Sequence, residues 1–253
     1  MIFLKTKPEI EKMRKSGKIL ARTMRLMSEA IVPGKTTPLE LDQLAKKLIE
    51  EAGATPSFLG YTVSGKKYSF STCISVNSIV VHGIPDSKPL QEGDIVGLDL
   101  GVFLDEWHAD AAWTYPVGTI STSAQKLLNV TKESLYQGIS KSKVHSYVGD
   151  ISFAIQKYVE SHGFSVVREL VGHGIGQHLH EEPSVPNFGK PKSGIKLKEG
   201  MTLCIEPMVN EGTYKVKTLP DDWSLITEDG KLSAHFEHMI AITKDGPDIL
   251  TLE

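Results

Sequence analysis

The fold is decided by one stretch, residues 95–115, which reads IVGLDLGVFLDEWHADAAWTY. Its two apolar runs, Ile95 to Leu104 and Trp107 to Tyr115, have the composition of β-strands, and the short link between them is typical of a hairpin. Successive side chains of a strand point to opposite faces. One face of this hairpin therefore carries large apolar residues and belongs in the core. The other face carries small or polar residues and is expected to line a hollow.

Two aspartates project from the hollow face. A turn centred on Leu104 and Asp105 places Asp99 directly opposite Asp110. Like charges opposite each other destabilise a sheet, and a carboxylate buried without a partner is costly unless it takes up a proton. Neither strand contains Lys or Arg, so a divalent metal ion between the carboxylates is the simplest explanation. If the pair is considered alone, the alternative to a metal site is that both aspartates lie on a solvent-exposed face of the hairpin.

Two glutamates further along the chain favour the metal. Glu206 lies in the apolar run Met201 to Val209, and Glu237 lies in the apolar run Ala234 to Ile242. Both runs are predicted strands, and an unpaired glutamate is rarely tolerated inside one. We therefore expect both glutamates to point inward, toward the aspartates.

A histidine supplies the fifth candidate ligand. His173 lies in Val171 to Pro183, VGHGIGQHLHEEP, where the glycines exclude a stable helix and let the backbone approach a site closely. A lone histidine here is more often structural than a ligand, but four carboxylates nearby reverse that expectation. The predicted metal ligands are Asp99, Asp110, His173, Glu206 and Glu237.

The charge of this set fits two divalent cations. Four carboxylates and one neutral imidazole carry a charge of −4, and such an oxygen-rich set suits Mn, Fe(II), Co or Zn, with Ni as a further option. Two ions about 3.5–4 Å apart can hold a hydroxide at neutral pH, polarise a carbonyl and orient a leaving group. The chemistry that these residues predict is attack of water on an amide or ester.

Amphipathic helices are expected around the strands. Apolar residues recur at steps of three and four in Thr6 to Ala30, and further helices are predicted at Thr37 to Gly53, Ala124 to Ser140 and Asp150 to Ser161. Another strand-like run is Cys73 to Val81.

The order helix, helix, strands occurs twice, which favours an internal repeat, although any two amphipathic helices that end in glycine align comparably well. No linker rich in Pro, Gly or Ser separates the halves. We therefore predict one domain, residues 1–253, with halves of about 6–120 and 121–250.

Composition narrows the partners and the compartment. The formal net charge of −3 gives no reason to expect nucleic acid or an anionic membrane as a partner. The two cysteines, Cys73 and Cys204, lie in separate apolar runs, which favours a reducing compartment over a disulfide framework. The first residues contain no apolar stretch long enough for a signal peptide. The cytoplasm is the expected location.

At this point the residues resemble the type I methionine aminopeptidases, a group within peptidase family M24, over nearly the whole chain. The short bacterial form, without an N-terminal extension, fits better than the type II or eukaryotic type I forms. The motifs that carry the resemblance are Cys73–Asn77 (CISVN), Val81–Pro85 (VHGIP), Gly93–Val96 (GDIV), Gly172–Gly176 (GHGIG), His180–Pro183 (HEEP), Ile205–Pro207 (IEP) and Phe236–His238 (FEH), together with Asp99 and Asp110.

The resemblance implies the pita-bread fold. This is an α/β (α+β) architecture in which a pseudo-two-fold antiparallel sheet is covered by two helix pairs, with a dinuclear metal site at its centre. It also implies removal of the initiator methionine from nascent proteins whose second residue is small, through a hydroxide that bridges the metals. The expected partners are the N-terminus of the nascent polypeptide and, transiently, the ribosome, and the chain is expected to be a monomer.

The resemblance also assigns roles. It implies that Asp99 binds one metal with both oxygens, that Asp110 and Glu237 bridge, and that His173 and Glu206 complete the second metal's shell. It further implies that Glu206 acts as general base or proton shuttle. His82 and His180 resemble the substrate-side histidines, which bind the peptide and stabilise the tetrahedral intermediate; the alternative is a structural role behind the ligands.

Tyr61, Cys73 and Trp223 resemble parts of the pocket for the methionine side chain, since a thioether is well held by aromatic and sulfur surfaces. The chain departs from the family in four places: Phe58, the segment Thr62 to Thr72, His178 and Leu179. His178 is interpreted as a bystander.

Two other functions compete. A non-catalytic binding module on the same fold would require lost ligands, whereas all five are present. The related prolidases and aminopeptidases P, which act on Xaa-Pro bonds, resemble the chain in ligands but normally carry a separate N-terminal domain.

Overall fold

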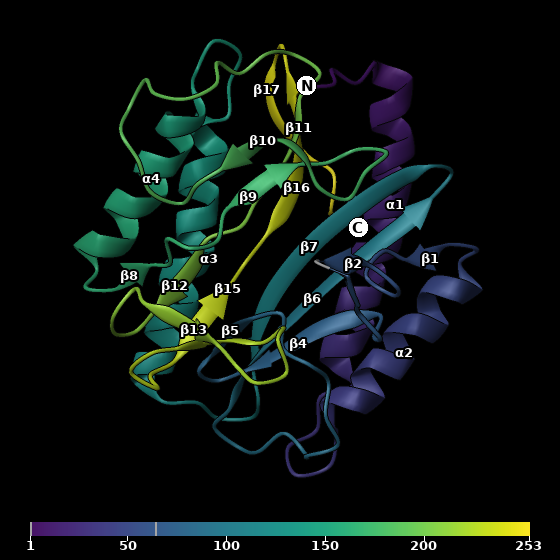
Figure 1. Ribbon diagram of the computed structural model, residues 1–253, viewed down its shortest axis with the longest axis vertical. Coiled ribbons are helices and arrows are strands. Elements are labelled where there is room, and N and C mark those ends of the chain that lie inside the picture. The colour runs from purple at the N-terminus through teal and green to yellow at the C-terminus, as the bar shows by residue number, and fades with distance from the viewer. Residues whose placement is uncertain (1, 64) are drawn as a thin grey trace.

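A pair of helices stands at each side of the molecule, with strands between them (Figure 1). The computed structural model describes residues 2–63 and 65–253, so Ser64, in the segment Thr62 to Thr72, lies outside the described residues. One pair is α1 (Lys7–Glu29) with α2 (Pro38–Glu51), and the other is α3 (Thr122–Lys141) with α4 (Val148–Ser161). Every strand ladder is antiparallel. The predicted architecture, antiparallel sheets covered by two helix pairs, is confirmed.

The helices begin where the capping residues indicate. Thr37 caps α2, because its hydroxyl accepts the N–H of Glu40 at 3.2 Å while the Glu40 carboxylate accepts the N–H of Thr37 at 2.9 Å. Helix α4 begins at Val148, two residues before the predicted start at Asp150. The Asp150 carboxylate instead reaches back to accept the N–H of Tyr147 at 2.8 Å, so Asp150 lies in the first turn and does not precede it.

The central hairpin consists of β6 (Ile95–Leu104) and β7 (Trp107–Pro116). Asp99 pairs with Ala112, and Asp110 pairs with Gly101, so the predicted register, with the aspartates directly opposed, is wrong by two residues. The turn is centred on Asp105 and Glu106, which both have positive φ, 50° and 71°. Positive φ at both central residues gives a turn whose twist matches that of the flanking strands.

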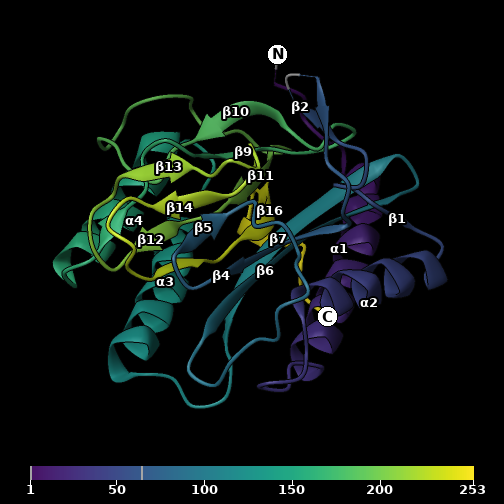
Figure 2. The same ribbon diagram turned by 60° about the horizontal axis from the view of Figure 1, so that its bottom comes forward.

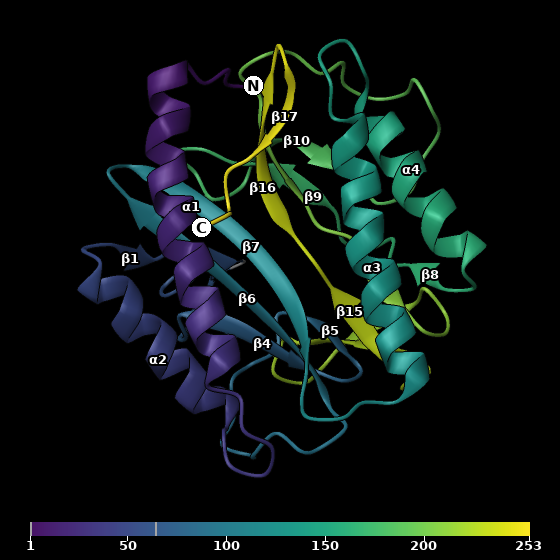
Figure 3. The ribbon, with the colours of Figure 1, turned by 180° about the vertical axis from the view of Figure 1, so that it is seen from behind.

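The corrected register keeps both aspartates on one face. A shift of two residues preserves the alternation of a strand, so Asp99 and Asp110 become diagonal neighbours on the same side of the hairpin. The opposite face, which carries the large apolar residues, packs against α1 (Figure 3). The predicted division into a core face and a cavity face is confirmed.

The remaining strands form four further sheets and complete the sheet that contains the hairpin. The predicted run Cys73 to Val81 is two strands, because Asn77 adopts a φ of 55° and turns the chain between them. The first sheet contains β1 (Thr55–Pro56), β6, β4 (Thr72–Val76) and β7; the second contains β10 (Glu181–Val185), β9 (Gly172–Gly174), β11 (Thr202–Ile205), β16 (His238–Thr243) and β17 (Gly246–Ile249). The smaller sheets contain β15 (Ser233–His235), β12 (Met208–Asn210) and β8 (Ser165–Val166); β13 (Val216–Thr218), β14 (Leu225–Thr227) and β5 (Ile79–Val81); and β2 (Thr62–Val63) with β3 (Lys66–Lys67).

Glu206 and Glu237 lie where the chain passes from one sheet to another. Glu206 falls between β11 and β12, and Glu237 falls between β15 and β16. The prediction that both lie inside continuous strands is therefore wrong. Pro207 has no N–H to donate to a ladder, which helps to end the first run after Glu206. Because β11 pairs with β16 and β12 pairs with β15, the breaks at Glu206 and Glu237 lie beside each other.

Two clusters of buried apolar side chains fill the space between helices and sheets. The first joins α1 and α2 to the apolar face of the hairpin and includes Met13, Leu20, Leu41, Leu98 and Leu100. The second joins α3 and α4 to the second sheet and includes Leu127, Ile151, Leu203 and Ile240. Trp113 of β7 packs against both clusters. Figure 2 shows the strands of the two sides meeting between the helix pairs. The division into halves near residue 120 stays a prediction.

Both cysteines are buried free thiols. Among the described residues, no helix combines the length and the apolar composition needed to span a membrane.

A buried carboxylate ties α2 to the strand that lies beside Asp99. The Oδ1 atom of Asp42 accepts the N–H of Ser71 at 2.9 Å, and the N–H and hydroxyl of Thr72 at 2.9 and 2.8 Å. These bonds fix the start of β4, whose next residue, Cys73, pairs with Asp99.

We expect Asp42→Ala to lower the free energy of unfolding by on the order of 3 kcal/mol, because it leaves buried donors without a partner. Asp245→Ala, at an exposed aspartate, is the control, and a change within about 0.5 kcal/mol is expected there. Urea denaturation of both variants measures this difference. An Asp42→Ala protein as stable as the control would show that these hydrogen bonds do not anchor β4.

Candidate metal centre

One cavity of about 330 Å³ opens between the two sides of the molecule, and every predicted site residue lines it. These residues come from the hairpin, from β4 and β9 and from the connections between strands. They are Tyr61, Cys73, His82, Asp99, Asp110, His173, His180, Glu206, Trp223 and Glu237.

The hairpin delivers the two aspartates to one wall of the cavity. Asp110 is 4% exposed, and its Oδ1 atom has no hydrogen-bond partner among the described residues. Asp99 is less enclosed than Asp110. Small residues flank the pair within the hairpin, since the partners of Asp99 and Asp110 between β6 and β7 are Ala112 and Gly101. Ser57 and Phe58 pack against Gly101.

The sheet-to-sheet connections deliver the two glutamates to the opposite wall. The Glu237 N–H donates to the Ala112 carbonyl at 2.7 Å, which pins this connection to the hairpin. The Glu206 carbonyl accepts from the Asn187 side-chain amide at 3.0 Å. The Glu237 side chain is buried, and its Oε1 atom has no partner among the described residues.

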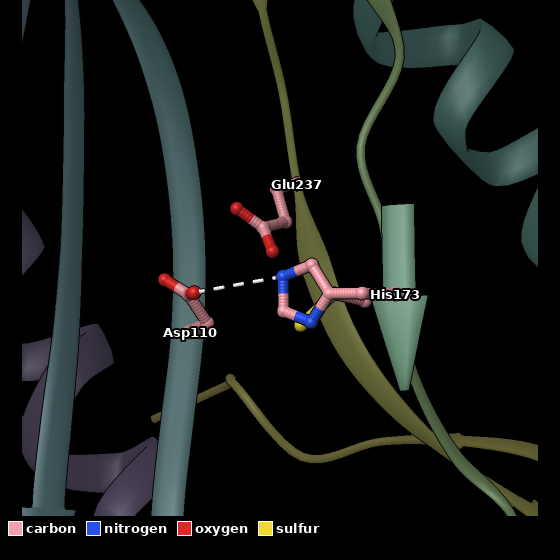
Figure 4. Close-up of side chains that lie close together, drawn as sticks. Asp110, His173 and Glu237 are labelled. Atoms are coloured by element: carbon pink, nitrogen blue, oxygen red, sulfur yellow. Dashed lines mark ion pairs between the residues drawn. The ribbon is translucent and has the colours of Figure 1, made fainter. Parts of the chain in front are cut away.

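His173 completes the group from β9. Its Nδ1 atom donates to the Gly174 carbonyl at 2.8 Å, which leaves the lone pair on Nε2 for a ligand. Nε2 lies 3.9 Å from Oδ2 of Asp110 and 3.7 Å from Oε1 of Glu206. Figure 4 shows His173, Asp110 and Glu237 pointing toward one another from different strands and connections.

The glycines on either side of His173 allow β9 to pack closely against the strands next to it. A Cβ atom on Gly172 would lie 2.4 Å from the Cys204 carbonyl oxygen, and one on Gly174 would lie 2.3 Å from the Glu182 carbonyl oxygen. Both distances are shorter than any real contact, so larger residues would force β9 away from its neighbours.

Burial makes the carboxylates reluctant to ionise. It raises the pKa of Asp99 to about 7, an effect that His235 opposes and Glu206 reinforces. It likewise raises the pKa of Glu206 to about 8. The pKa values of Asp110 and Glu237 rise well above their usual range, through burial and then through neighbouring carboxylates.

The residues fit a metal site. Two buried carboxylate oxygens lack partners, and no Lys or Arg stands among the described residues that line the cavity. Burial lowers the pKa of His173 to about 3, so its imidazole is neutral, as a metal ligand must be. Oxygen donors with one imidazole suit first-row divalent ions. Cations are therefore the natural partners for this group of side chains.

The substrate-side candidates line the same cavity. The Tyr61 hydroxyl lies 2.7 Å from Nδ1 of His180, and the His180 ring stands edge-on to His173, with 4.3 Å between ring centroids. His82 occupies a left-handed conformation with a φ of 56°, and burial lowers its pKa to about 4.

An apolar wall extends from the metal ligands. Trp223 stands edge-on to Tyr68, with 5.0 Å between ring centroids. Phe58, Val63 and Leu179 also line the cavity, so three of the positions that depart from the family pattern form part of its wall.

Sequence reasoning missed two residues that lie close to the predicted ligands. His235 lines the cavity, and its buried Nε2 atom lies 3.5 Å from Oε2 of Glu206 without a hydrogen-bond partner among the described residues. Alternation from Glu237, two residues on, would have placed His235 on the same side. Cys204 groups with Asp110, His173 and Glu237, with one donor atom of each within 4.8 Å of the others. Cys204 lies two residues before Glu206, so alternation along the strand would have placed it on the same side as Glu206.

Known proteins share both this sequence and this architecture. The sequence profile of "Metallopeptidase family M24" matches residues 11–244. A methionine aminopeptidase of Clostridium perfringens is 55% identical over 254 residues, covering 100% of this chain and 99% of the relative. The crystal structure of a methionine aminopeptidase from Thermotoga maritima superimposes with a TM-score of 0.96 at 45% identity, covering 100% of both chains. A prolidase of Pyrococcus furiosus, at 22% identity and a TM-score of 0.80 over 99% of this chain and 65% of its own, shares the fold alone. The predicted pita-bread fold is thereby confirmed.

The raised carboxyl pKa values predict how the stability of the metal-free protein depends on pH. Above about pH 7 the buried histidines are neutral in the folded and the unfolded chain alike, whereas the folded chain still holds protons on buried carboxyl groups such as Asp99 and Glu206 that the unfolded chain has released. The free energy of unfolding therefore falls as pH rises from about 7 to 8.5. Bound cations replace these protons, and added Mn²⁺ should therefore stabilise the protein most at the alkaline end. Thermal unfolding in chelator and in Mn²⁺, from about pH 7 to 8.5, measures both effects.

Glu206→Gln is the matched variant for this experiment, because it removes one ionising group and should flatten part of the decline. A metal-free protein that is more stable at about pH 8.5 than at about pH 7, and indifferent to Mn²⁺, would contradict the prediction.

Proposed function

The chain belongs to metallopeptidase family M24, and we propose that it is a metal-dependent methionine aminopeptidase, which removes the N-terminal methionine from peptides and nascent proteins whose second residue is small. One observation carries the proposal: five ligand-type side chains from distant parts of the sequence line a single cavity that also has an apolar side. The 55% identity to a methionine aminopeptidase over the whole chain supports it.

Asp99, Asp110, His173, Glu206 and Glu237 would hold two divalent ions. When bound, the ions lower the pKa of water and polarise the scissile carbonyl. The orphaned oxygens of Asp110 and Glu237 support this assignment. The donor set admits Co, Mn, Fe(II), Zn or Ni and does not choose sharply among them.

Glu206 would handle the proton of the attacking water. Its carboxylate oxygens lie 3.7 Å from Nε2 of His173 and 3.5 Å from Nε2 of His235. A carboxylate placed at the edge of the cation site can accept a proton from water and pass it to the leaving amine.

His82 and His180 would face the peptide. Burial lowers the pKa of both imidazoles, so they are neutral at pH 7 and each keeps one N–H to donate. When the Tyr61 hydroxyl donates to Nδ1 of His180, the proton of His180 resides on Nε2. Donors of this kind stabilise the oxygen that gains negative charge as water attacks.

The apolar wall would receive the methionine side chain. Tyr61, Cys73 and Trp223 line this part of the cavity, together with Phe58 and Leu179. A flexible thioether packs well on aromatic and sulfur surfaces, so this wall favours methionine over a charged side chain.

We also propose that the enzyme works in the cytoplasm, where its two buried thiols stay reduced. Its substrate is a polypeptide N-terminus; a monomeric state and a transient contact with the ribosome stay predictions.

Chelation should abolish release of methionine from a Met-Ala-Ser peptide, and added Co²⁺ or Mn²⁺ should restore it. Chromatography of the released amino acid measures the rate. A parallel assay with an Xaa-Pro substrate should give little hydrolysis. Full activity of rigorously metal-free protein would contradict metal dependence, whereas faster cleavage of the Xaa-Pro substrate would make the chain a prolidase.

His82→Ala should lower kcat about 10²-fold or more, because it removes a hydrogen bond made in the transition state. Metal content, measured by elemental analysis, should not change. His178→Ala is the control: this histidine is exposed and is interpreted as a bystander. Turnover of His82→Ala equal to that of the control would end the assignment.

A further inference from the structure

An ion pair outside the cavity is buried at the start of the chain. Among the described residues, Lys5 is the one buried lysine, and its side chain and that of Glu181 are each only 4% exposed. The Lys5 ammonium donates to the Glu181 carboxylate. Lysine is seldom buried unless it has a partner, so this pair indicates a specific role.

The pair connects the N-terminal arm, residues 3–6, to the histidine loop, residues 175–181. Lys5 Nζ also donates to the Phe3 carbonyl at 3.2 Å, and the Lys5 N–H donates to the Gly200 carbonyl at 2.7 Å, so the arm itself is fixed. On the loop side, the second carboxylate oxygen of Glu181 accepts the His178 N–H at 3.2 Å. Glu181 thus joins the arm to the loop backbone.

Gly176 makes room for this pair. A Cβ atom there would lie 2.4 Å from Oε1 of Glu181 and 2.6 Å from Cε of Lys5. The Gly176 carbonyl also accepts the N–H of His108 at 2.9 Å. Because His108 is two residues from Asp110 on β7, the same glycine ties the histidine loop to the hairpin that carries the metal ligands.

The residue before Glu181 is His180, whose ring contacts Tyr61 and His173. We infer that Lys5 is a positioning residue: through its ion pair with Glu181, the N-terminal arm holds the histidine loop so that His180 faces the substrate. The inference rests on the proposed role of His180. Lys5 itself does not line the cavity.

Removal of one partner of a buried ion pair leaves the other charge without compensation. In Lys5→Met the Glu181 carboxylate would turn toward water, and the loop would move with it. Glu181→Gln breaks the pair from the other side. Gly176→Ala should push the two side chains apart while keeping both charges.

The decisive test is a double-mutant cycle between Lys5 and His180 with the Met-Ala-Ser peptide. A small displacement of a catalytic group is costly, so we expect Lys5→Met to lower kcat about tenfold with KM nearly unchanged. In the His180→Ala background the same substitution should have less than about a twofold effect. Glu181→Gln should reproduce Lys5→Met in both backgrounds. Lys7→Met, at an exposed lysine two residues on, is the matched control and should leave kcat unchanged.

Hydrogen exchange of residues 175–181 gives a readout independent of activity. Lys5→Met should accelerate it, and Lys7→Met should not. An equal loss of kcat in both backgrounds would overturn the inference, because Lys5 would then act through general stability. Hydrogen exchange that Lys5→Met leaves unchanged would also overturn it. If the wild type releases no methionine while exchange still responds to Lys5→Met, the proposed function fails and the link between arm and loop stands.

Discussion

The burial of four carboxylates around one cavity is the constraint on which the rest of this structure depends. Asp99, Asp110, Glu206 and Glu237 line this cavity. Burial raises the pKa of each, and neighbouring carboxylates raise it further at Asp99, Asp110 and Glu237. Protons or cations must compensate such a cluster. The neutral imidazole of His173 and the partnerless oxygens of Asp110 and Glu237 suit the cluster to binding cations rather than to holding protons.

The fold meets this constraint by drawing ligands from both of its sides. The hairpin, packed on α1 by its apolar face, supplies the two aspartates, and the interrupted strands beneath α3 and α4 supply the glutamates. The Glu237 N–H bonds to Ala112 of the hairpin, so the two walls are joined within the site. Neither side alone supplies all five predicted ligands.

Much of this arrangement could be predicted from sequence, because alternation along a strand is local information. It placed Asp99 and Asp110 on one face even though the predicted turn was one residue early, since a two-residue error in register leaves the faces unchanged. The break at Glu237 was not predicted, because apolar residues continue across it and give no local signal. The break at Glu206 was also missed, although Pro207 directly after it is a local signal against a continuous strand.

Lys5 and His235 show where such reasoning stops. The partner of Lys5 is Glu181, 176 residues away, and nothing near Lys5 distinguishes it from the exposed lysines around it. His235 faces Glu206 only because β12 and β15 pair and carry their neighbours together. Contacts of this kind follow from the assembled sheets and cannot be derived from any single segment.

Anomalous diffraction from crystals grown with Mn²⁺ tests the central claim most directly. The account predicts manganese peaks enclosed by the Asp99, Asp110, His173, Glu206 and Glu237 side chains, with the oxygens of Asp110 and Glu237 among the ligands. A cavity without anomalous density, or carboxylates turned away from one another, would contradict it.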